Sequence, residues 1–293
     1  MRVMVTGSRG MLGRALCRRL DAEHAVIEAH RGWFDVTDES STRKAIASER
    51  PDVVVHAAAY TRVDDCETHR EAAFAVNAAG TRHVALGCLD CGAWMLYVST
   101  DYVYDGEKGR PYVEEDPTAP LGVYGASKLE GERELARLGI PHMVVRTSWL
   151  FGPGGSNFVR TVYGALSLGR PLKVVDDQVG SPTYTVDLAD AVARLLAVQG
   201  RGVVHVANAG ACSWFQLARA VLEATGRTDV PLTPISSRDL GRPARRPRYS
   251  VLDTGRYTSL TGHRLRPWRD ALREYLEAEG WLDSKATAEP AEG

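Results

Sequence analysis

Short, continuous apolar runs alternate with amphipathic stretches along the first half of the chain. The apolar runs have the length of strands, and the stretches between them carry apolar residues at helical spacing. The pattern predicts strands at Arg2–Thr6, His24–Ala29, Asp52–Ala58, Trp94–Ser99 and His142–Thr147, and helices at Met11–Leu20, Ser40–Ser48, Glu71–Leu89 and Tyr124–Arg137. Because such strands are apolar on both faces, we expect an α/β fold: a Rossmann-type, doubly wound parallel sheet with a smaller C-terminal substrate-binding lobe.

After Trp149 the pattern is looser and interrupted by glycine, proline and arginine. It predicts helices at Asn157–Leu168, Asp187–Ala197, Trp214–Ala224 and Pro267–Glu279, and strands at Leu172–Val175 and Val203–Val206. We expect residues 1–148 to form a dinucleotide-binding domain to which residues 174–206 return. Residues 149–173 and 207–282 are expected to form the smaller lobe, and residues 283–293 a disordered tail.

The composition excludes several classes of protein. The 293-residue chain has a net charge of −1, so no global field draws it to nucleic acid or an anionic membrane. No apolar run is long enough to span a bilayer or to act as a signal peptide. The five cysteines are odd in number and sparse, which favours reduced thiols in a cytoplasmic protein. Cys88 and Cys91 form a lone CxxC pair, which we interpret as inert.

A glycine-rich loop follows the first predicted strand and precedes the first predicted helix. Its spacing is GxxGxxG, at Gly7, Gly10 and Gly13, with Arg9, Met11 and Leu12 between them. Glycines in this position allow a tight turn and let backbone N–H groups approach a pyrophosphate at the helix N-terminus. The alternative is a plain glycine turn, but the position after the first strand favours a dinucleotide site.

The residues after the next two strands refine this prediction. NAD-binding proteins usually carry an acid at the end of the second strand, whereas this chain has Arg31 there. Arg31 and Arg9 could both meet a 2′-phosphate, so we favour NADP, although Arg31 could also be a solvated loop residue. Asp35 and Val36 are expected to border the adenine, and the small residues Ala57, Ala58 and Ala59 to let the cofactor approach. His56 is expected to be packed rather than catalytic.

Tyr124 and Lys128 form a YxxxK pair at the start of a predicted helix. A spacing of four places both side chains on one face, where the ammonium group should lower the pKa of the phenol and make it a general acid or base. Lys128 could also bind the nicotinamide ribose. Ser99, Thr100 and Asp101 end the fourth strand, at the edge where ligands bind, unless they only cap its turn.

Motifs along nearly the whole chain resemble the dTDP-4-dehydrorhamnose reductase family of the extended short-chain dehydrogenases. They are Gly7–Gly13, His56–Ala59, Ser99–Gly106, Pro120–Lys128, Arg146–Leu150, Asn157-Phe158, Asp177–Thr183 and Ala244–Pro247, with Ser250 and Leu252-Asp253. The resemblance implies transfer of a hydride from NADPH, with NADH as an alternative, to the C4 keto group of a dTDP-4-keto-6-deoxysugar, as in dTDP-L-rhamnose synthesis.

The resemblance also implies roles for individual residues. Tyr124 would donate the proton, and Thr100 would orient the substrate carbonyl. Lys128 would tune the pKa of Tyr124 and hold the nicotinamide ribose. Ser99 would border the cofactor. Residues expected to bind the substrate are Thr100, Asp101, Trp149 and Asn157 around the sugar and Arg245 and Arg246 around the phosphates.

One departure and three alternatives remain. Some family members dimerise through magnesium held by a glutamate of the first helix. This chain has Ala15 at that position. We therefore expect no metal, and either a monomer or a homodimer. A dehydratase or epimerase would have a second acid after Asp101, where this chain has Tyr102. A non-catalytic subunit similar to the regulatory subunit of methionine adenosyltransferase would not need Tyr124 and Lys128. A ketoreductase of antibiotic sugar synthesis, such as a dihydrostreptose synthase, would share every motif.

Overall fold

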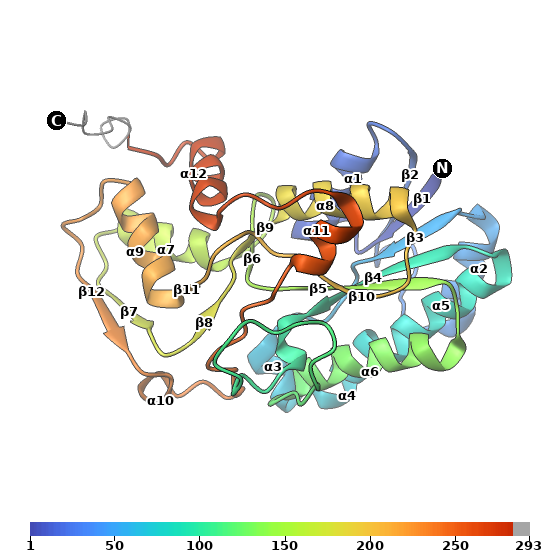
Figure 1. Cartoon of the computed structure of the whole chain (residues 1–293), viewed down its shortest axis with the longest axis horizontal. Coiled ribbons are helices and arrows are strands. Elements are labelled where there is room, and N and C mark those ends of the chain that lie inside the picture. Colours follow the sequence, from blue (N-terminus) through green and yellow to red (C-terminus); the bar gives the residue numbers. More distant parts are fainter. Residues whose placement is uncertain (284–293) are drawn as a thin grey trace.

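A six-stranded parallel sheet forms the centre of the computed structural model, which describes residues 1–283 (Figure 1). The strands lie in the order β10-β5-β4-β3-β1-β2. Their bounds are β1 Arg2–Thr6, β2 Ala25–Ala29, β3 Val53–His56, β4 Trp94–Thr100, β5 His142–Thr147 and β10 Gly202–His205. The chain winds outward in both directions from β1 and β3, which leaves a crevice at their carboxyl ends. The predicted Rossmann-type fold is confirmed.

Helices cover both faces of this sheet because alternate residues of each strand point to opposite sides. Val3 and Val5 of β1 pack in one core with α1 (Met11–Leu20), α8 (Thr185–Val198) and α11 (Gly255–Thr261). Met4 points the other way, into a core with α2 (Glu39–Glu49), α5 (Gly80–Cys91) and α6 (Val123–Leu138). Figure 1 shows α1, α8 and α11 above the sheet and α2, α5 and α6 below it.

The predicted helix Glu71–Leu89 is confirmed as a continuous helical run, but a π-helical turn interrupts it and a separate short helix precedes it. The short helix is α3 (Val63–Thr68), and the continuous run consists of α4 (Arg70–Phe74), the π-helical turn η1 (Ala75–Ala79) and α5. Within η1, the side chain of Asn77 accepts from the backbone of Tyr60 (2.8 Å) and donates to it (3.1 Å), and it also donates to the Ser127 hydroxyl (2.9 Å). A wider turn at this point lets a buried amide hold the strand-to-helix connection, a common use of π-turns beside functional sites.

The smaller lobe has its own apolar core, at the left of Figure 1. Its helices are α7 (Phe158–Ser167), α9 (Trp214–Ala224), α10 (Ser237–Leu240) and α12 (Trp268–Ala278), and its short strands are β6 (Leu150–Phe151), β7 (Leu172–Val175), β8 (Val179–Gly180), β9 (Thr183–Tyr184), β11 (Cys212–Ser213) and β12 (Leu232–Ile235). Residues 174–206 do not return to the main sheet as one piece. β7 pairs with β12, β8 with β11 and β9 with β6, so the return begins only at α8.

The described part of the chain ends at Asp283. The predicted tail lies largely outside the described residues, and Asp283, its first residue, donates from its amide to the carbonyl of Ala224 (3.1 Å). Between residues 1 and 283, no helix has the length and apolar character needed to cross a membrane.

All five cysteines are free thiols; Cys88 is fully buried, and Cys91 donates to the carbonyl of Gly87 (3.3 Å).

Candidate active site

A cavity of about 940 Å³ opens at the carboxyl ends of the central strands. Residues that follow β1, β2, β3, β4 and β5 form one side of it, and the smaller lobe forms the other. It brings together most of the predicted site residues: Gly7, Arg9, Gly10, Met11, Leu12, Gly13, Arg31, Asp35, Val36, Ala57, Ala58, Ala59, Ser99, Thr100, Asp101, Tyr124, Lys128, Trp149 and Arg246.

The glycine loop closes tightly on itself at the start of α1. Gly7 has a φ of +70°, and the amide of Gly10 donates to its carbonyl (2.9 Å). A Cβ on Gly7 would lie 2.8 Å from the amide nitrogen of Ala58, so side chains are excluded at this point. α1 begins directly after Gly10 without a side-chain cap and without an acid in its first turn. Its first N–H groups therefore remain available to an anionic group.

Arg31, in the turn after β2, lies near Arg9 of the glycine loop. The Nε of Arg31 donates to the carboxylate of Asp35 (3.0 Å), and the Arg31 side chain is 89% exposed. A Cβ on Gly32 would lie 4.0 Å from Nη1 of Arg9, which puts both arginines at the same turn. The N–H and hydroxyl of Thr37, together with Arg31, hold the pKa of Asp35 below its usual value. Asp35 is therefore a charged, fixed acceptor in the cavity wall.

Tyr124 lies in the first turn of α6, and its ring packs edge-to-face against Tyr102, with ring centres 5.9 Å apart. Burial raises the pKa of the Tyr124 phenol above its ordinary value, and a hydrogen bond with Thr100 offsets only part of that effect. The predicted lowering of this pKa by Lys128 is wrong, because desolvation dominates at a buried phenol. The phenol is therefore protonated at neutral pH, which is the form that can donate a proton.

Lys128 lies one turn further along α6 and is 2% exposed. Its Nζ donates to the carbonyl of Val98 (2.6 Å) and lies 4.1 Å from the centre of the Tyr97 ring. Burial lowers the pKa of Lys128 to about 7, and the carboxylate of Glu132 acts in the opposite direction. The amine can therefore exchange a proton near neutral pH.

Thr100 and Asp101 end β4 at the cavity wall, and both are buried. The Thr100 hydroxyl donates to Oδ1 of Asp101 (3.2 Å) and accepts from the amide of Tyr102 (3.2 Å). Burial raises the pKa of Asp101 to about 7, against the effect of hydrogen bonds from Ser250 and Thr100. Within residues 1–283, the Oδ2 of Asp101 has no hydrogen-bond partner. A buried carboxyl oxygen in this state is suited to meet a polar group of a ligand.

Aromatic side chains form the wall on the side of the smaller lobe. The ring of Trp149 stacks on that of Trp214 at 3.5 Å, and Phe158 packs against Trp214 at 4.6 Å. Trp149 has a φ of +47°, which is unusual for a bulky residue and orients its indole. Sequence reasoning missed Trp214 because α9 lies outside the motifs, and it placed Phe158 in a motif without giving it a role. The sequence feature that could have pointed to both aromatic residues is their position at the first residue of a helix, directly after the N-caps Asn157 and Ser213.

Arg246 is the cation that the C-terminal segment brings to the cavity. It donates to both carboxylate oxygens of Asp64, each at 3.0 Å, and a hydrogen bond with Tyr102 adds to this arrangement. Asp64 and nearby charges hold the guanidinium in one orientation at the cavity edge. Arg246 also donates to the carbonyl of Ala244 (2.9 Å), so these contacts leave little more than its Nε–H for another anion.

Two predicted substrate residues do not line the cavity. Arg245 is exposed and borders a separate small pocket beside Glu67 and Pro247. Asn157 is the N-cap of α7: its side chain accepts from the amide of Arg160 (2.9 Å) and donates to the carbonyl of Gly152 (2.9 Å). The Asn157 amide is engaged in the helix cap and Arg245 lies beside the cavity rather than in its wall, so the substrate-binding roles of both residues stay predictions from the resemblance.

Behind the cavity wall, Glu132 of α6 links the end of β4 to β5. The guanidinium of Arg146 donates to its two carboxylate oxygens, at 3.0 and 2.6 Å, and the hydroxyl of Ser99 donates to it as well. The Ser99 side chain is therefore committed to this ion pair. Ser99 borders the cavity, but its hydroxyl is not free to bind a ligand.

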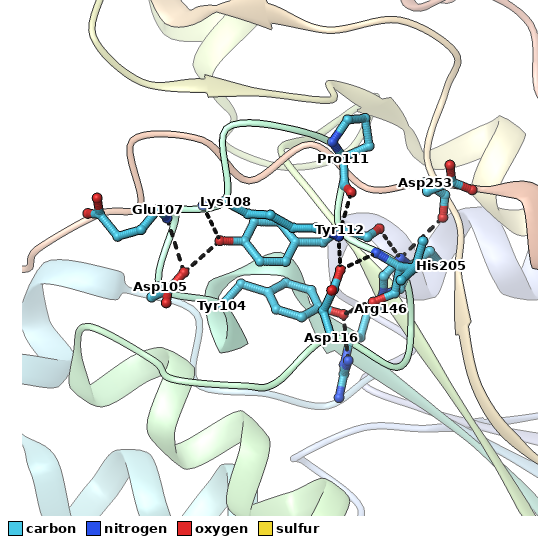
Figure 2. A network of polar contacts seen from close by, with 11 residues as sticks. Tyr104, Asp105, Glu107, Lys108, Pro111, Tyr112, Asp116, Arg146, His205 and Asp253 are labelled. Atoms are coloured by element: carbon cyan, nitrogen blue, oxygen red, sulfur yellow. Dashed lines mark hydrogen bonds and ion pairs between the residues drawn. The ribbon is translucent and has the colours of Figure 1, made fainter.

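The same arginine continues the network outward, as Figure 2 shows. Arg146 donates to the Tyr104 hydroxyl (2.7 Å), which in turn bonds Nε2 of His205 (2.7 Å), and the Tyr104 and Tyr112 rings stack with centres 4.2 Å apart. The Tyr112 hydroxyl donates to Asp105 (2.6 Å). The network joins β5 and β10 to the loop after Thr100, and so fixes the strand end that carries it.

Comparisons with known proteins indicate the family of the chain. Residues 1–280 match the model of the RmlD substrate binding domain. A dTDP-4-dehydrorhamnose reductase of Streptomyces griseus is 44% identical over 285 residues, 94% of this chain and 93% of the relative. A probable dTDP-4,6-dihydroxy-2-methyloxan-3-one 4-ketoreductase of Streptomyces antibioticus is 42% identical and covers 94% of both chains. The crystal structure of a Bacillus anthracis dTDP-4-dehydrorhamnose reductase with NADP superimposes with a TM-score of 0.89, at 35% identity, over 94% of this chain and 99% of that one.

Proposed function

Because the chain belongs to the RmlD substrate binding domain family, we propose that it is an NADPH-dependent reductase of a dTDP-4-keto-6-deoxysugar. The reaction reduces the C4 keto group, with dTDP-4-dehydrorhamnose as substrate and dTDP-L-rhamnose as product, as the name of the Streptomyces griseus relative supports. The observation that carries the proposal is that Thr100, Tyr124 and Lys128 lie in the same cavity as the glycine loop.

The residues around the loop fit NADPH. The cradle is too narrow for a side chain at Gly7, and the uncapped start of α1 offers N–H groups for the pyrophosphate. In this proposal Arg9 and Arg31 would hold a 2′-phosphate, Asp35 and Val36 would border the adenine, and Ala57, Ala58 and Ala59 would let the cofactor approach the sheet. When bound, NADPH supplies the hydride.

The residues on β4 and α6 handle the proton. The hydroxyls of Thr100 and Tyr124 are hydrogen-bond neighbours, so a keto oxygen that binds between them can accept from both once it replaces the hydrogen bonds that they make to each other and to Asp101. Tyr124 is protonated at neutral pH and gives its proton to that oxygen as it becomes an alcohol. The ammonium of Lys128 stabilises the resulting phenolate and holds the ribose. Asp101, whose pKa is raised to about 7, can donate to or accept from a sugar hydroxyl.

The substrate enters between the two parts of the fold. Arg246, oriented by Asp64, is placed to bind the diphosphate, and the stacked indoles of Trp149 and Trp214 form an apolar wall for the deoxysugar. A dehydratase would need a second acid beside Asp101, and the chain has Tyr102 at that place, 5.9 Å from the Tyr124 ring. We also infer that the enzyme works in the cytoplasm, which five free cysteines support.

A second candidate substrate is a related dTDP-keto sugar, because the Streptomyces antibioticus relative carries the name of a different 4-ketoreductase. Oxidation of NADPH with each purified keto sugar, followed by NMR of the product, distinguishes the two. We expect turnover with at least one dTDP-4-keto-6-deoxysugar and loss of that turnover in Tyr124→Phe. Absence of NADPH oxidation with all of them would contradict the proposal and favour a non-catalytic subunit.

A further inference from the structure

Tyr97 places the face of its ring against the charged group of Lys128. The ring centre lies 4.1 Å from Nζ, well within the distance at which an aromatic face attracts a cation. Both side chains are buried, with exposures of 0% for Tyr97 and 2% for Lys128. Desolvation strengthens such a contact, because water does not compete for the cation.

The buried ammonium has few other partners. In the described part of the chain, Nζ makes one hydrogen bond, to the carbonyl of Val98 (2.6 Å). Glu132 is the acid that favours its charged form, but that carboxylate already accepts two hydrogen bonds from Arg146 and one from Ser99. The ring of Tyr97 is therefore the remaining electron-rich surface in contact with the amine.

The ring itself is held in place from two sides. Its hydroxyl shares its one proton between the backbone carbonyls of Asn77 (3.2 Å) and Lys128 (3.3 Å), which ties β4 to η1 and α6. On β3, the ring of His56 stacks on it with centres 5.6 Å apart. Burial and the charge of Lys128 lower the pKa of His56 to about 3, so the stacked imidazole is neutral at working pH.

We propose that Tyr97 is a positioning residue of the reductase, whose ring face stabilises the ammonium form of Lys128 and fixes its place beside Tyr124. This inference rests on the proposed function, in which Lys128 acts as a cation. The groups that act on the amine are Tyr97 and the Val98 carbonyl on β4, Glu132 on α6, His56 on β3 and, through Glu132, Arg146 on β5.

The test is a series of nearly isosteric rings at position 97: phenylalanine and its mono-, di- and trifluorinated analogues. Tyr97→Phe removes the hydroxyl, and each fluorine then withdraws electron density from the ring face without removing its volume. Activity requires protonated Lys128 and falls as pH rises through the pKa of that amine. We expect this alkaline limb of the kcat profile to move to lower pH with each fluorine, by about one pH unit in total.

A second readout does not depend on turnover. NMR of lysine labelled with carbon-13 at Cε, assigned by the loss of one signal in Lys128→Met, follows the proton of Lys128 in the free protein. We expect the pH at the midpoint of the Lys128 titration to fall with each added fluorine. If the protein oxidises no NADPH while this midpoint still falls, the proposed function fails and the contact between Tyr97 and Lys128 stands.

Trifluorophenylalanine at Phe151 is the matched control. Phe151 is buried in the smaller lobe against Tyr184, outside the cavity, so neither the alkaline limb nor the midpoint should move. A midpoint that stays constant across the series at position 97 would overturn the inference. It would leave Tyr97 as a packing residue, whatever the activity of the variants.

Discussion

Two parallel hydrogen bonds, each 3.0 Å long, join the guanidinium of Arg246 to the carboxylate of Asp64. This pair connects α3 to a segment almost two hundred residues away in the sequence and presents Arg246 to the cavity. Its neighbour Arg245 points to solvent and lies outside the cavity. The two adjacent arginines therefore offer a matched pair of substitutions.

Arg246→Gln is expected to raise the KM for the dTDP-sugar roughly 10- to 100-fold, because a charged hydrogen bond to the diphosphate is lost. The dissociation constant for NADPH should stay near the wild-type value. Steady-state kinetics with Arg245→Gln as the control measures the difference. Equal increases in KM for both variants would mean that neither arginine has a specific place at the phosphates.

Gly13→Ala is expected to weaken NADPH binding by at least about tenfold. A Cβ at this position would lie 2.1 Å from the carbonyl oxygen of Gly7, so the loop must open and lose its cradle. Fluorescence titration with NADPH measures the effect. Gly164→Ala is the control, since a Cβ there meets nothing within 4 Å. Wild-type affinity in Gly13→Ala would contradict the placement of the pyrophosphate.

Tyr124→Phe is expected to lower kcat roughly 100- to 10,000-fold, the usual loss when a positioned general acid is removed. NADPH affinity should be nearly unchanged, because Lys128 and the glycine loop remain. Tyr163→Phe, in α7 of the smaller lobe, is the control for loss of a tyrosine hydroxyl. A variant at position 124 with near wild-type kcat would remove Tyr124 from the mechanism.

Asp101→Asn is expected to change how stability depends on pH. The carboxyl has a pKa of about 7 in the folded chain and an ordinary value near 3.8, so between these pH values the folded state binds more protons than the unfolded state. The free energy of unfolding contributed by Asp101 therefore falls as pH rises from about 4 to 7. The variant should be more stable than wild type at pH 8, by roughly 1–3 kcal/mol, and lose this advantage near pH 4.

Urea unfolding at both pH values measures this effect, and Asp105→Asn serves as a control of opposite sign. The hydroxyl of Tyr112 and the amide of Glu107 hold the pKa of Asp105 below its ordinary value. Its contribution to stability is therefore present at neutral pH and lost as pH falls through the lowered value. A pH-independent difference for Asp101→Asn would show that its carboxyl titrates normally.

Local sequence patterns were sufficient for the part of the site carried by single turns. The glycine loop, the pair Tyr124 and Lys128, and the end of β4 at Thr100 depend on spacing within one strand or one helix, and each lies in the cavity. Periodicity did not reveal the π-turn at Asn77, because the extra residue of a π-turn shifts the apolar pattern by one position and the segment there is mostly alanine.

Long-range packing decided the features that the sequence left open or predicted wrongly. Trp214 reaches the cavity only because α9 packs beside β7 and α7, and Arg246 rather than Arg245 faces inward because Asp64 binds it. The pKa of Tyr124 rises because the folded chain buries the phenol, a quantity that no spacing of residues contains.

The most direct test of the proposed reaction follows the label of deuterated NADPH into the sugar. The protein is incubated with dTDP-4-keto-6-deoxysugar and NADPH carrying deuterium at the transferable C4 position, and the product is analysed by NMR. We predict one deuterium at C4 of the sugar and its near absence with Tyr124→Phe. Unlabelled product, or label at another carbon, would contradict direct reduction of the C4 keto group.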